Sequence, residues 1–296
     1  MKKLIVLSLV IAAMPLAGGF FIPSHAQANT PTFYRLVPGT YVNGWPRFTI
    51  SYPKGWIEHR PRFDEVFRAA APGSSRYPAL EVIVGPWPLP RNKFVDTSLP
   101  LFRALGRDVT VVTDKPSRLR NGTSAREVEF QYVNDGTPIN WLGLVTKKGD
   151  IWIHADVGSP NGKIGEDLRA IPYSIEFQPG GDERVKLPPD VQKFLDKWCT
   201  DLMSRDVTKI VAYYSDRYLE SGWKKGQWVQ FVRDAIGPIT SVRVGITDFQ
   251  AAGDRAYLAG YIYINSEKTW LHETSLIKQN GGWRWYGNQR DAAPLD

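Results

Sequence analysis

Residues 178–189, Gln-Pro-Gly-Gly-Asp-Glu-Arg-Val-Lys-Leu-Pro-Pro, separate two parts of the chain that have different sequence patterns. Proline, glycine and charged residues make up most of this segment, which is the composition of a linker between domains. Before it, apolar residues recur at every second position, as in strands; after it, they recur with the 3.6-residue period of helices. The sequence therefore predicts two domains, at residues 32–178 and 190–291, joined by a linker at 179–189.

The part before the linker is predicted to be mostly strand, because β-branched and aromatic runs alternate with turn residues. The predicted strands cover residues 48–52, 79–84, 109–119, 125–133, 141–146, 151–157 and 173–177. Helical spacing occurs at residues 92–106 and 164–171. Turn signals such as Asn121-Gly122 join neighbouring strands, so we expect an antiparallel meander.

Three short motifs in this part resemble the PsbP-like family. They are Phe48-Thr-Ile-Ser-Tyr-Pro-Lys-Gly-Trp56, Lys148-Gly-Asp-Ile-Trp152, and residues 168–177 with Ser174 and Phe177. The resemblance covers the whole first domain and implies an α/β/α arrangement around an antiparallel sheet. It brings no general catalytic motif with it.

The part after the linker is predicted to form three helices and then a long antiparallel sheet. The helical stripes lie at residues 191–202, 207–214 and 228–236, with Asp206 as the N-cap of the second helix. The predicted strands cover residues 239–249, 255–265, 269–278 and 283–288. Helices followed by a sheet make an α+β domain, and α+β is the fold class expected for the whole chain.

This second part resembles the nuclear transport factor 2-like superfamily, also called SnoaL-like. The motifs that carry the resemblance are Tyr213-Tyr-Ser-Asp-Arg-Tyr218 with Gly222, Gly253-Asp-Arg-Ala256, and Gly281-Gly-Trp-Arg-Trp285. It is most similar to the versions found in exported bacterial proteins, and it implies a cone-shaped domain whose sheet curls around a cavity closed by helices. Because this fold serves isomerases, dehydratases, ligand binders and oligomerisation modules alike, the resemblance leaves both the function and a homodimer open.

Two turns predict which side chains face that cavity. Asn280-Gly281 is a strong hairpin signal, and it pairs Leu276 with Trp285. A turn at Ser266-Glu267 gives two further pairs, Tyr261 with His272 and Tyr263 with Trp270. Side chains alternate along a strand, so one face is predicted to hold Tyr257, Tyr261, Tyr263, Trp270, His272, Thr274, Leu276, Trp283 and Trp285. A register slip of one residue would exchange the two faces.

An aromatic face with one histidine and a few hydroxyls suits an apolar ligand cavity. The predicted ligand-binding residues are Tyr214, Tyr261, His272, Thr274 and Trp285. The alternative is that these aromatic side chains are core and pack against the helical stripes, since large aromatic residues dominate protein cores.

Catalytic and metal-binding groups are sparse in this sequence. An isomerase of this superfamily needs a carboxylate base and an acid in its pocket, and the predicted aromatic face carries no Asp or Glu. His154-Ala-Asp156 offers two metal ligands, too few for a site, so no metal and no cofactor are expected. The single cysteine, Cys199, lies in an amphipathic helical pattern and is expected to act as a small buried hydrophobe.

The first 28 residues have the pattern of a secretory signal peptide. Lys2 and Lys3 precede an apolar run at 4–22, and small residues end at Ala28, where cleavage is expected. Pro15 and Gly18 interrupt the run, which argues against its alternative role as an uncleaved membrane anchor. The mature protein is therefore predicted to be periplasmic or secreted, with no membrane span.

The charges do not point to nucleic acid, because the 37 Lys and Arg residues are interspersed with 30 acidic residues. The sequence therefore predicts an exported, non-catalytic accessory protein. It would bind a small apolar or aromatic ligand, or a component of the cell envelope, through its C-terminal domain. The alternative is an isomerase or dehydratase that uses His272 with Tyr261 or Tyr214 in the same cavity.

Overall fold

The computed structural model describes residues 39–288, with gaps at 60, 62–64, 75–76, 87–92, 161–162, 180–182, 221–222, 236–238 and 272–274. The predicted signal peptide and its cleavage site at Ala28 lie outside the described residues. The described chain combines helices with strands that pair mostly antiparallel, as predicted. None of the helices within these ranges is both long enough and apolar enough to cross a membrane.

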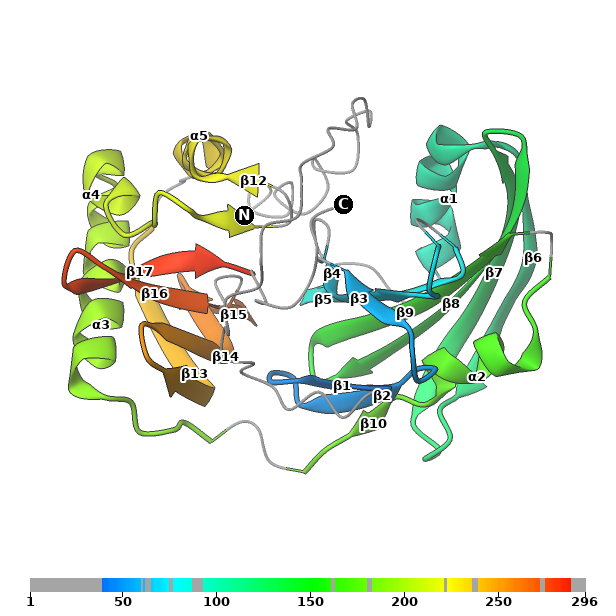
Figure 1. Cartoon of the computed structure of the whole chain (residues 1–296), viewed down its shortest axis with the longest axis horizontal. Coiled ribbons are helices and arrows are strands. Elements are labelled where there is room, and N and C mark those ends of the chain that lie inside the picture. The colour runs from blue at the N-terminus through cyan, green and yellow to red at the C-terminus, as the bar shows by residue number, and fades with distance from the viewer. Residues whose placement is uncertain are drawn as a thin grey trace.

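A seven-stranded antiparallel sheet forms the centre of the first half (Figure 1). Its strands, in spatial order, are β3 (Ile57–His59), β4 (Glu65–Ala70), β5 (Ala79–Pro86), β9 (Ile151–Pro160), β8 (Thr137–Lys148), β7 (Ser124–Asn134) and β6 (Arg107–Arg118). The sequence predicts β5 to β9 because they are long and separated by turn signals. The strand pattern resumes at Trp56, directly before the three-residue β3, but the sequence misses β4, whose six residues are all buried and therefore do not alternate.

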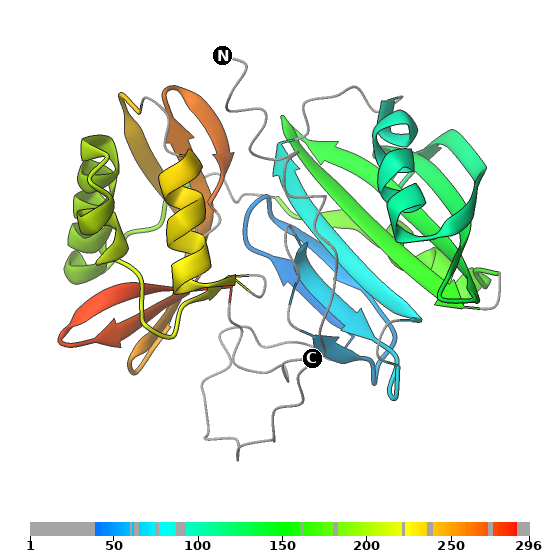
Figure 2. The same cartoon turned by 90° about the horizontal axis from the view of Figure 1, so that it is seen from above.

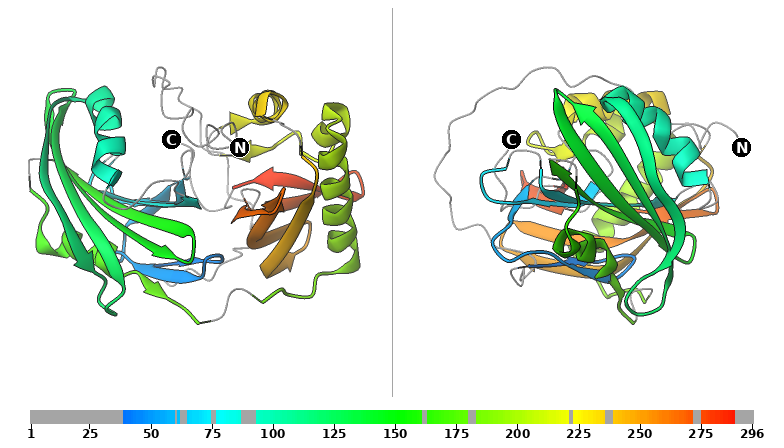
Figure 3. Two further views of the ribbon diagram at one scale, coloured as in Figure 1. Left: turned by 180° about the vertical axis from the view of Figure 1, so that it is seen from behind. Right: turned by 90° about the vertical axis from the view of Figure 1, so that its right-hand side faces the viewer.

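Helix α1 (Phe94–Leu105) packs on one face of this sheet, near β6 and β7. The ring of Phe102 lies 4.2 Å from that of Phe130 and 4.8 Å from that of Trp141, measured between centroids. These aromatic contacts form a core between helix and sheet. Viewed from behind, α1 and the first helix of the second half stand at opposite ends of the molecule (Figure 3).

The other face of the large sheet is covered by helix α2 and a small sheet. Helix α2 spans Glu166–Tyr173, and the small sheet contains β1 (Thr40–Asn43), β2 (Phe48–Ser51) and β10 (Glu176–Phe177). Arg169 of α2 forms ion pairs with the buried carboxylates of Glu127 and Glu129, at 3.1 and 2.7 Å. The first half thus has a helix on each face of an antiparallel sheet.

The second half contains three helices and a five-stranded antiparallel sheet (Figure 1). The helices are α3 (Pro189–Ser204), α4 (Val207–Val211) and α5 (Lys225–Ala235), and a short pair, β11 (Leu219–Glu220) and β12 (Trp223–Lys224), precedes α5. The sheet contains β13 (Val242–Ala252), β14 (Arg255–Ile264), β15 (Glu267–Trp270), β16 (Ser275–Gln279) and β17 (Gly282–Gly287). Asp206 caps α4 as predicted, because its Oδ1 accepts hydrogen bonds from the backbone of Thr208 and Lys209.

The helices pack on one face of the second sheet, and the opposite face packs against the first half. We call these the helix-side face and the seam. In the seam, the ring centroids of Trp45 and Tyr261 are 5.5 Å apart, and the Lys268 ammonium lies 5.0 and 4.1 Å from them. The linker is attached here, because the Val185 N–H donates to the Ile246 carbonyl at 2.9 Å. Figure 2 shows the two halves side by side.

The hairpin turn between β14 and β15 lies one residue earlier than predicted. Asn265 and Ser266 both have positive φ, which is the geometry that tight two-residue hairpins require. Tyr261 consequently pairs with Trp270 rather than with His272, and Tyr263 pairs with Lys268. The predicted register of this hairpin is therefore wrong by two residues.

The predicted single strand at 269–278 is two strands, β15 and β16, and the alternation shifts between them. Ala256 pairs with Leu276, whereas continuation of the β15 register would place Ser275 there. Leu276 pairs with Trp285, as predicted. The shift of one residue places Leu276 and Trp285 on the helix-side face, opposite to Tyr261.

Candidate ligand site under the helices of the second half

The residues predicted to bind a ligand do not form one site. Tyr214 and Trp285 lie together in the core under the helices, while Tyr261 lies on the opposite face of the sheet, in the seam. His272 and Thr274 lie outside the described residues. The prediction that Tyr261 and Trp285 share one face is wrong, because the alternation shifts between β15 and β16. A ligand-binding role for Tyr214 and Trp285 stays a prediction.

Backbone hydrogen bonds hold Tyr214 against Trp285. The Trp285 N–H donates to the Tyr213 carbonyl at 2.8 Å, and the Ser215 N–H donates to the Trp285 carbonyl at 3.0 Å. The Trp285 side chain is 0% exposed, and its ring meets those of Phe194 and Trp198 edge-on at 5.4 and 5.1 Å. This pairing joins the segment after α4 to the last strand of the sheet.

Three tryptophans of this core, Trp198, Trp228 and Trp285, have buried indole N–H groups for which the described residues supply no acceptor. We call them the indole cluster. By contrast, the indole N–H of Trp283 donates to Asp190 Oδ2 at 2.8 Å. A buried donor without a partner costs about 1–3 kcal/mol, so three in one core are unusual for purely structural residues. An acceptor from outside the chain would remove that cost.

Tyrosine rings lie near Trp228, and the short strand β11 carries a buried carboxylate. The Trp228 ring lies 6.3 Å from Tyr214 and 5.8 Å from Tyr218. Glu220 of β11 is 6% exposed, and the carbonyl of the preceding Leu219 lies so close to Gly287 that a Cβ there would meet it at 2.1 Å. A buried carboxylate therefore lies where β11 meets the last strand. Sequence reasoning missed it because β11 has only two residues.

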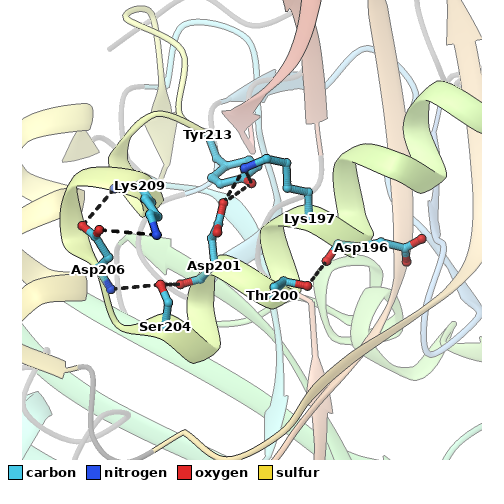
Figure 4. A network of polar contacts seen from close by, with 8 residues as sticks. All are labelled: Asp196, Lys197, Thr200, Asp201, Ser204, Asp206, Lys209 and Tyr213. Atoms are coloured by element: carbon cyan, nitrogen blue, oxygen red, sulfur yellow. Dashed lines mark hydrogen bonds and ion pairs between the residues drawn. The ribbon is translucent and has the colours of Figure 1, made fainter.

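A polar network fixes α3 against the segment that carries Tyr214 (Figure 4). The Tyr213 hydroxyl donates to Asp201 Oδ2 at 2.5 Å, and the Lys197 ammonium lies 2.7 Å from the same oxygen. The hydrogen bond from Lys197 lowers the pKa of Asp201, while burial raises the pKa of Tyr213. Tyr213, itself a buried member of this core, consequently helps to hold its neighbour Tyr214 in place.

Cys199 lies on α3, close to this core. Burial raises the pKa of the Cys199 thiol to about 12, so the thiol is protonated at neutral pH. Within the described ranges, no group of three or more His, Cys, Asp or Glu side chains is placed to hold a metal ion.

Comparison with known proteins finds similar solved structures, all at low sequence identity. No family model and no curated protein matches the chain. It is similar to a crystal structure from Bacteroides thetaiotaomicron, with a TM-score of 0.34 and 11% identity over 83% of this chain and 88% of that one. It is also similar to cyanobacterial PsbP (CyanoP) from Synechocystis, with a TM-score of 0.35 and 14% identity over 52% and 98%.

A third similar structure is Bd1075 from Bdellovibrio bacteriovorus, with a TM-score of 0.26 and 8% identity over 78% of this chain and 90% of that one. All three scores are too low to establish a shared fold or function.

Proposed function

We propose that this chain is an exported, non-catalytic accessory protein that binds a small, mostly apolar ligand under the helices of its second half. The observation that carries the proposal is the indole cluster, with its three buried N–H donors and no acceptor among the described residues. A ligand oxygen placed among these donors would supply the missing acceptor. The surrounding aromatic rings supply the apolar walls that small-molecule sites have.

The chemistry of the cluster narrows the ligand class. All three indole groups are donors and cannot accept, so the ligand must carry acceptor atoms such as carbonyl, sulfonate or carboxylate oxygens. Phe194, Tyr214 and Tyr218 contribute ring surface around them. The ligand is thus an apolar or aromatic molecule with at least one polar oxygen.

The cellular setting rests on the sequence. The signal-like pattern ending at Ala28 supports export to the periplasm, where the ligand would be an envelope component or a molecule that crosses the envelope. In this proposal the first half is PsbP-like, and the second half is a nuclear transport factor 2-like domain whose cavity holds the ligand.

An enzymatic alternative has one supporting observation, the buried Glu220 of β11. A carboxylate in a largely apolar core is the group that an isomerase or dehydratase of this kind needs as its base. If this alternative holds, Glu220→Gln abolishes turnover of the bound molecule and leaves its binding intact.

Native mass spectrometry of the exported protein tests the proposal. The full chain is expressed with its own N-terminal segment, isolated from the periplasm and weighed under native and denaturing conditions. We expect a polypeptide beginning at Asn29 and a native mass that exceeds the denatured mass by one small molecule. Equal masses, together with no fluorescence enhancement of the apolar anion 1-anilinonaphthalene-8-sulfonate, would contradict the proposal.

A further inference from the structure

A row of charged and polar side chains crosses the large sheet of the first half, on the face that carries α1. The strand pairing places His59 opposite Arg68, Arg68 opposite Glu81, and Glu81 opposite Asp156. Because side chains directly opposite one another share a face, these four lie in one line over β3, β4, β5 and β9. The row lies in the other half of the molecule from the indole cluster.

Two nitrogens of the buried Arg68 guanidinium have no hydrogen-bond partner in the part of the chain that the structure describes. Its side chain is 1% exposed, and its Nε and Nη1 atoms have no acceptor among the described residues. Its ion pair with Glu81 is loose, with 3.5 Å between Nε and Oε1, and the Glu81 side chain is 27% exposed. A buried charge with so little compensation is costly unless another group supplies partners.

The neighbouring members of the row are better satisfied. Asp156 accepts a hydrogen bond from the Trp141 indole N–H at 3.0 Å. His154, on the same side of β9, lies 3.7 Å from Asp156, and burial lowers its pKa to about 3, so it is neutral. His154 Nε2 also has no hydrogen-bond partner among the described residues, and the row itself holds the unused donors of Arg68, beside the partly exposed Glu81.

We propose that Arg68 and Glu81 form a binding site for a free α-amino acid. The ligand carboxylate would accept hydrogen bonds from Arg68, whose planar fork matches a carboxylate. The ligand ammonium would donate to Glu81, whose side chain provides the opening to solvent. A zwitterion brings no net charge, so the charges of Arg68 and Glu81 stay balanced when the ligand binds.

Simpler ions do not fit this pair as well. A lone anion would sit beside the Glu81 carboxylate, and a lone cation beside the Arg68 guanidinium, so each would meet a like charge. Ala70 and Ala79, which pair with each other on the same face, are small and buried. The two charges together therefore favour a molecule that carries both an ammonium and a carboxylate.

Isothermal titration of the full chain with glycine, L-alanine, D-alanine and L-glutamate tests this site, with acetate and methylamine as half-ligands. We expect at least one amino acid to bind with a Kd below about 1 mM and both half-ligands to bind at least about tenfold more weakly. Two variants should each weaken binding of the amino acid by at least about tenfold: Glu81→Gln, which keeps the shape of the side chain, and Arg68→Met.

Arg126→Met is the matched control, because Arg126 lies on the same face of the sheet and is already ion-paired with Asp114 at 2.5 Å. It should bind the amino acid as the unmodified chain does. No binding by any of the four amino acids up to about 10 mM, or unchanged binding in Glu81→Gln, would overturn the proposal. Either result leaves the ligand of the indole cluster unaffected, since that site lies in the second half.

Discussion

Aromatic side chains pack on both faces of the second sheet, but their polar atoms are hydrogen-bonded to different extents on the two faces. Between the helices and the helix-side face, Trp198 of α3 and Trp285 of β17 are buried with their indole N–H groups unpaired among the described residues. In the seam, the polar ends have partners: the Tyr261 hydroxyl accepts from Arg184 at 3.4 Å, and Lys268 stacks on Trp45 and Tyr261. Both regions are rich in aromatic residues, so aromatic content does not separate them. What distinguishes the structural contact from the candidate binding site is that its polar atoms have partners within the chain.

Removing the largest side chain of the helix-side face tests whether that face is packed. Trp285→Ala should destabilise the protein by about 3–5 kcal/mol, because it deletes a fully buried ring in contact with Phe194 and Trp198. Urea denaturation measures the loss. A change below about 1 kcal/mol would contradict the packing of this ring against Phe194 and Trp198.

Adding a methyl group at Gly245, on the seam side of the sheet, should destabilise the protein less than Trp285→Ala. The Tyr261 ring lies over Gly245, where an added Cβ would approach the ring to 2.3 Å. Gly245→Ala should therefore push Tyr261 out of the seam and cost about 1–3 kcal/mol, as overpacking does. Gly226→Ala, at a helix position where nothing lies within 4 Å, is the control and should not destabilise. Equal stability of the two variants would show that the ring has room elsewhere.

The smallest effect expected is the coupling across the seam itself. A double-mutant cycle with Trp45→Ala and Tyr261→Ala should give a coupling energy of about 0.5–1.5 kcal/mol, the range for aromatic pairs in contact. The measurement is again chemical denaturation of the single and double variants. Additive losses would indicate that the two halves do not touch at this pair in solution.

Much of the secondary structure follows from the sequence for identifiable reasons. The strands β5 to β9 have turn residues between them, and α3 and α4 have a clear helical stripe with Asp206 as a cap. The hairpin at Asn280-Gly281 pairs Leu276 with Trp285 as its turn type requires. Local chemistry decides each of these features.

The composition of the candidate site could not be predicted in the same way. The shift between Trp270 and Ser275 leaves no mark in a run of alternating residues, yet it moves Trp285 to the face opposite Tyr261. The indole N–H of Trp283 donates to Asp190, 93 residues away, while that of Trp285 has no acceptor in the described chain. No sequence pattern predicts this difference. Hydrogen-bond satisfaction is a tertiary property.

The central claim is that the unpaired indole N–H of Trp285 is a ligand donor, and one matched pair of variants tests it. Trp285→Phe keeps an aromatic ring and removes the unpaired donor, whereas Trp283→Phe removes a donor that Asp190 already satisfies. The measurement is the Kd of 1-anilinonaphthalene-8-sulfonate by fluorescence titration. We predict binding weaker by about tenfold in Trp285→Phe and unchanged within about twofold in Trp283→Phe. Equal affinities in the two folded variants would contradict the claim.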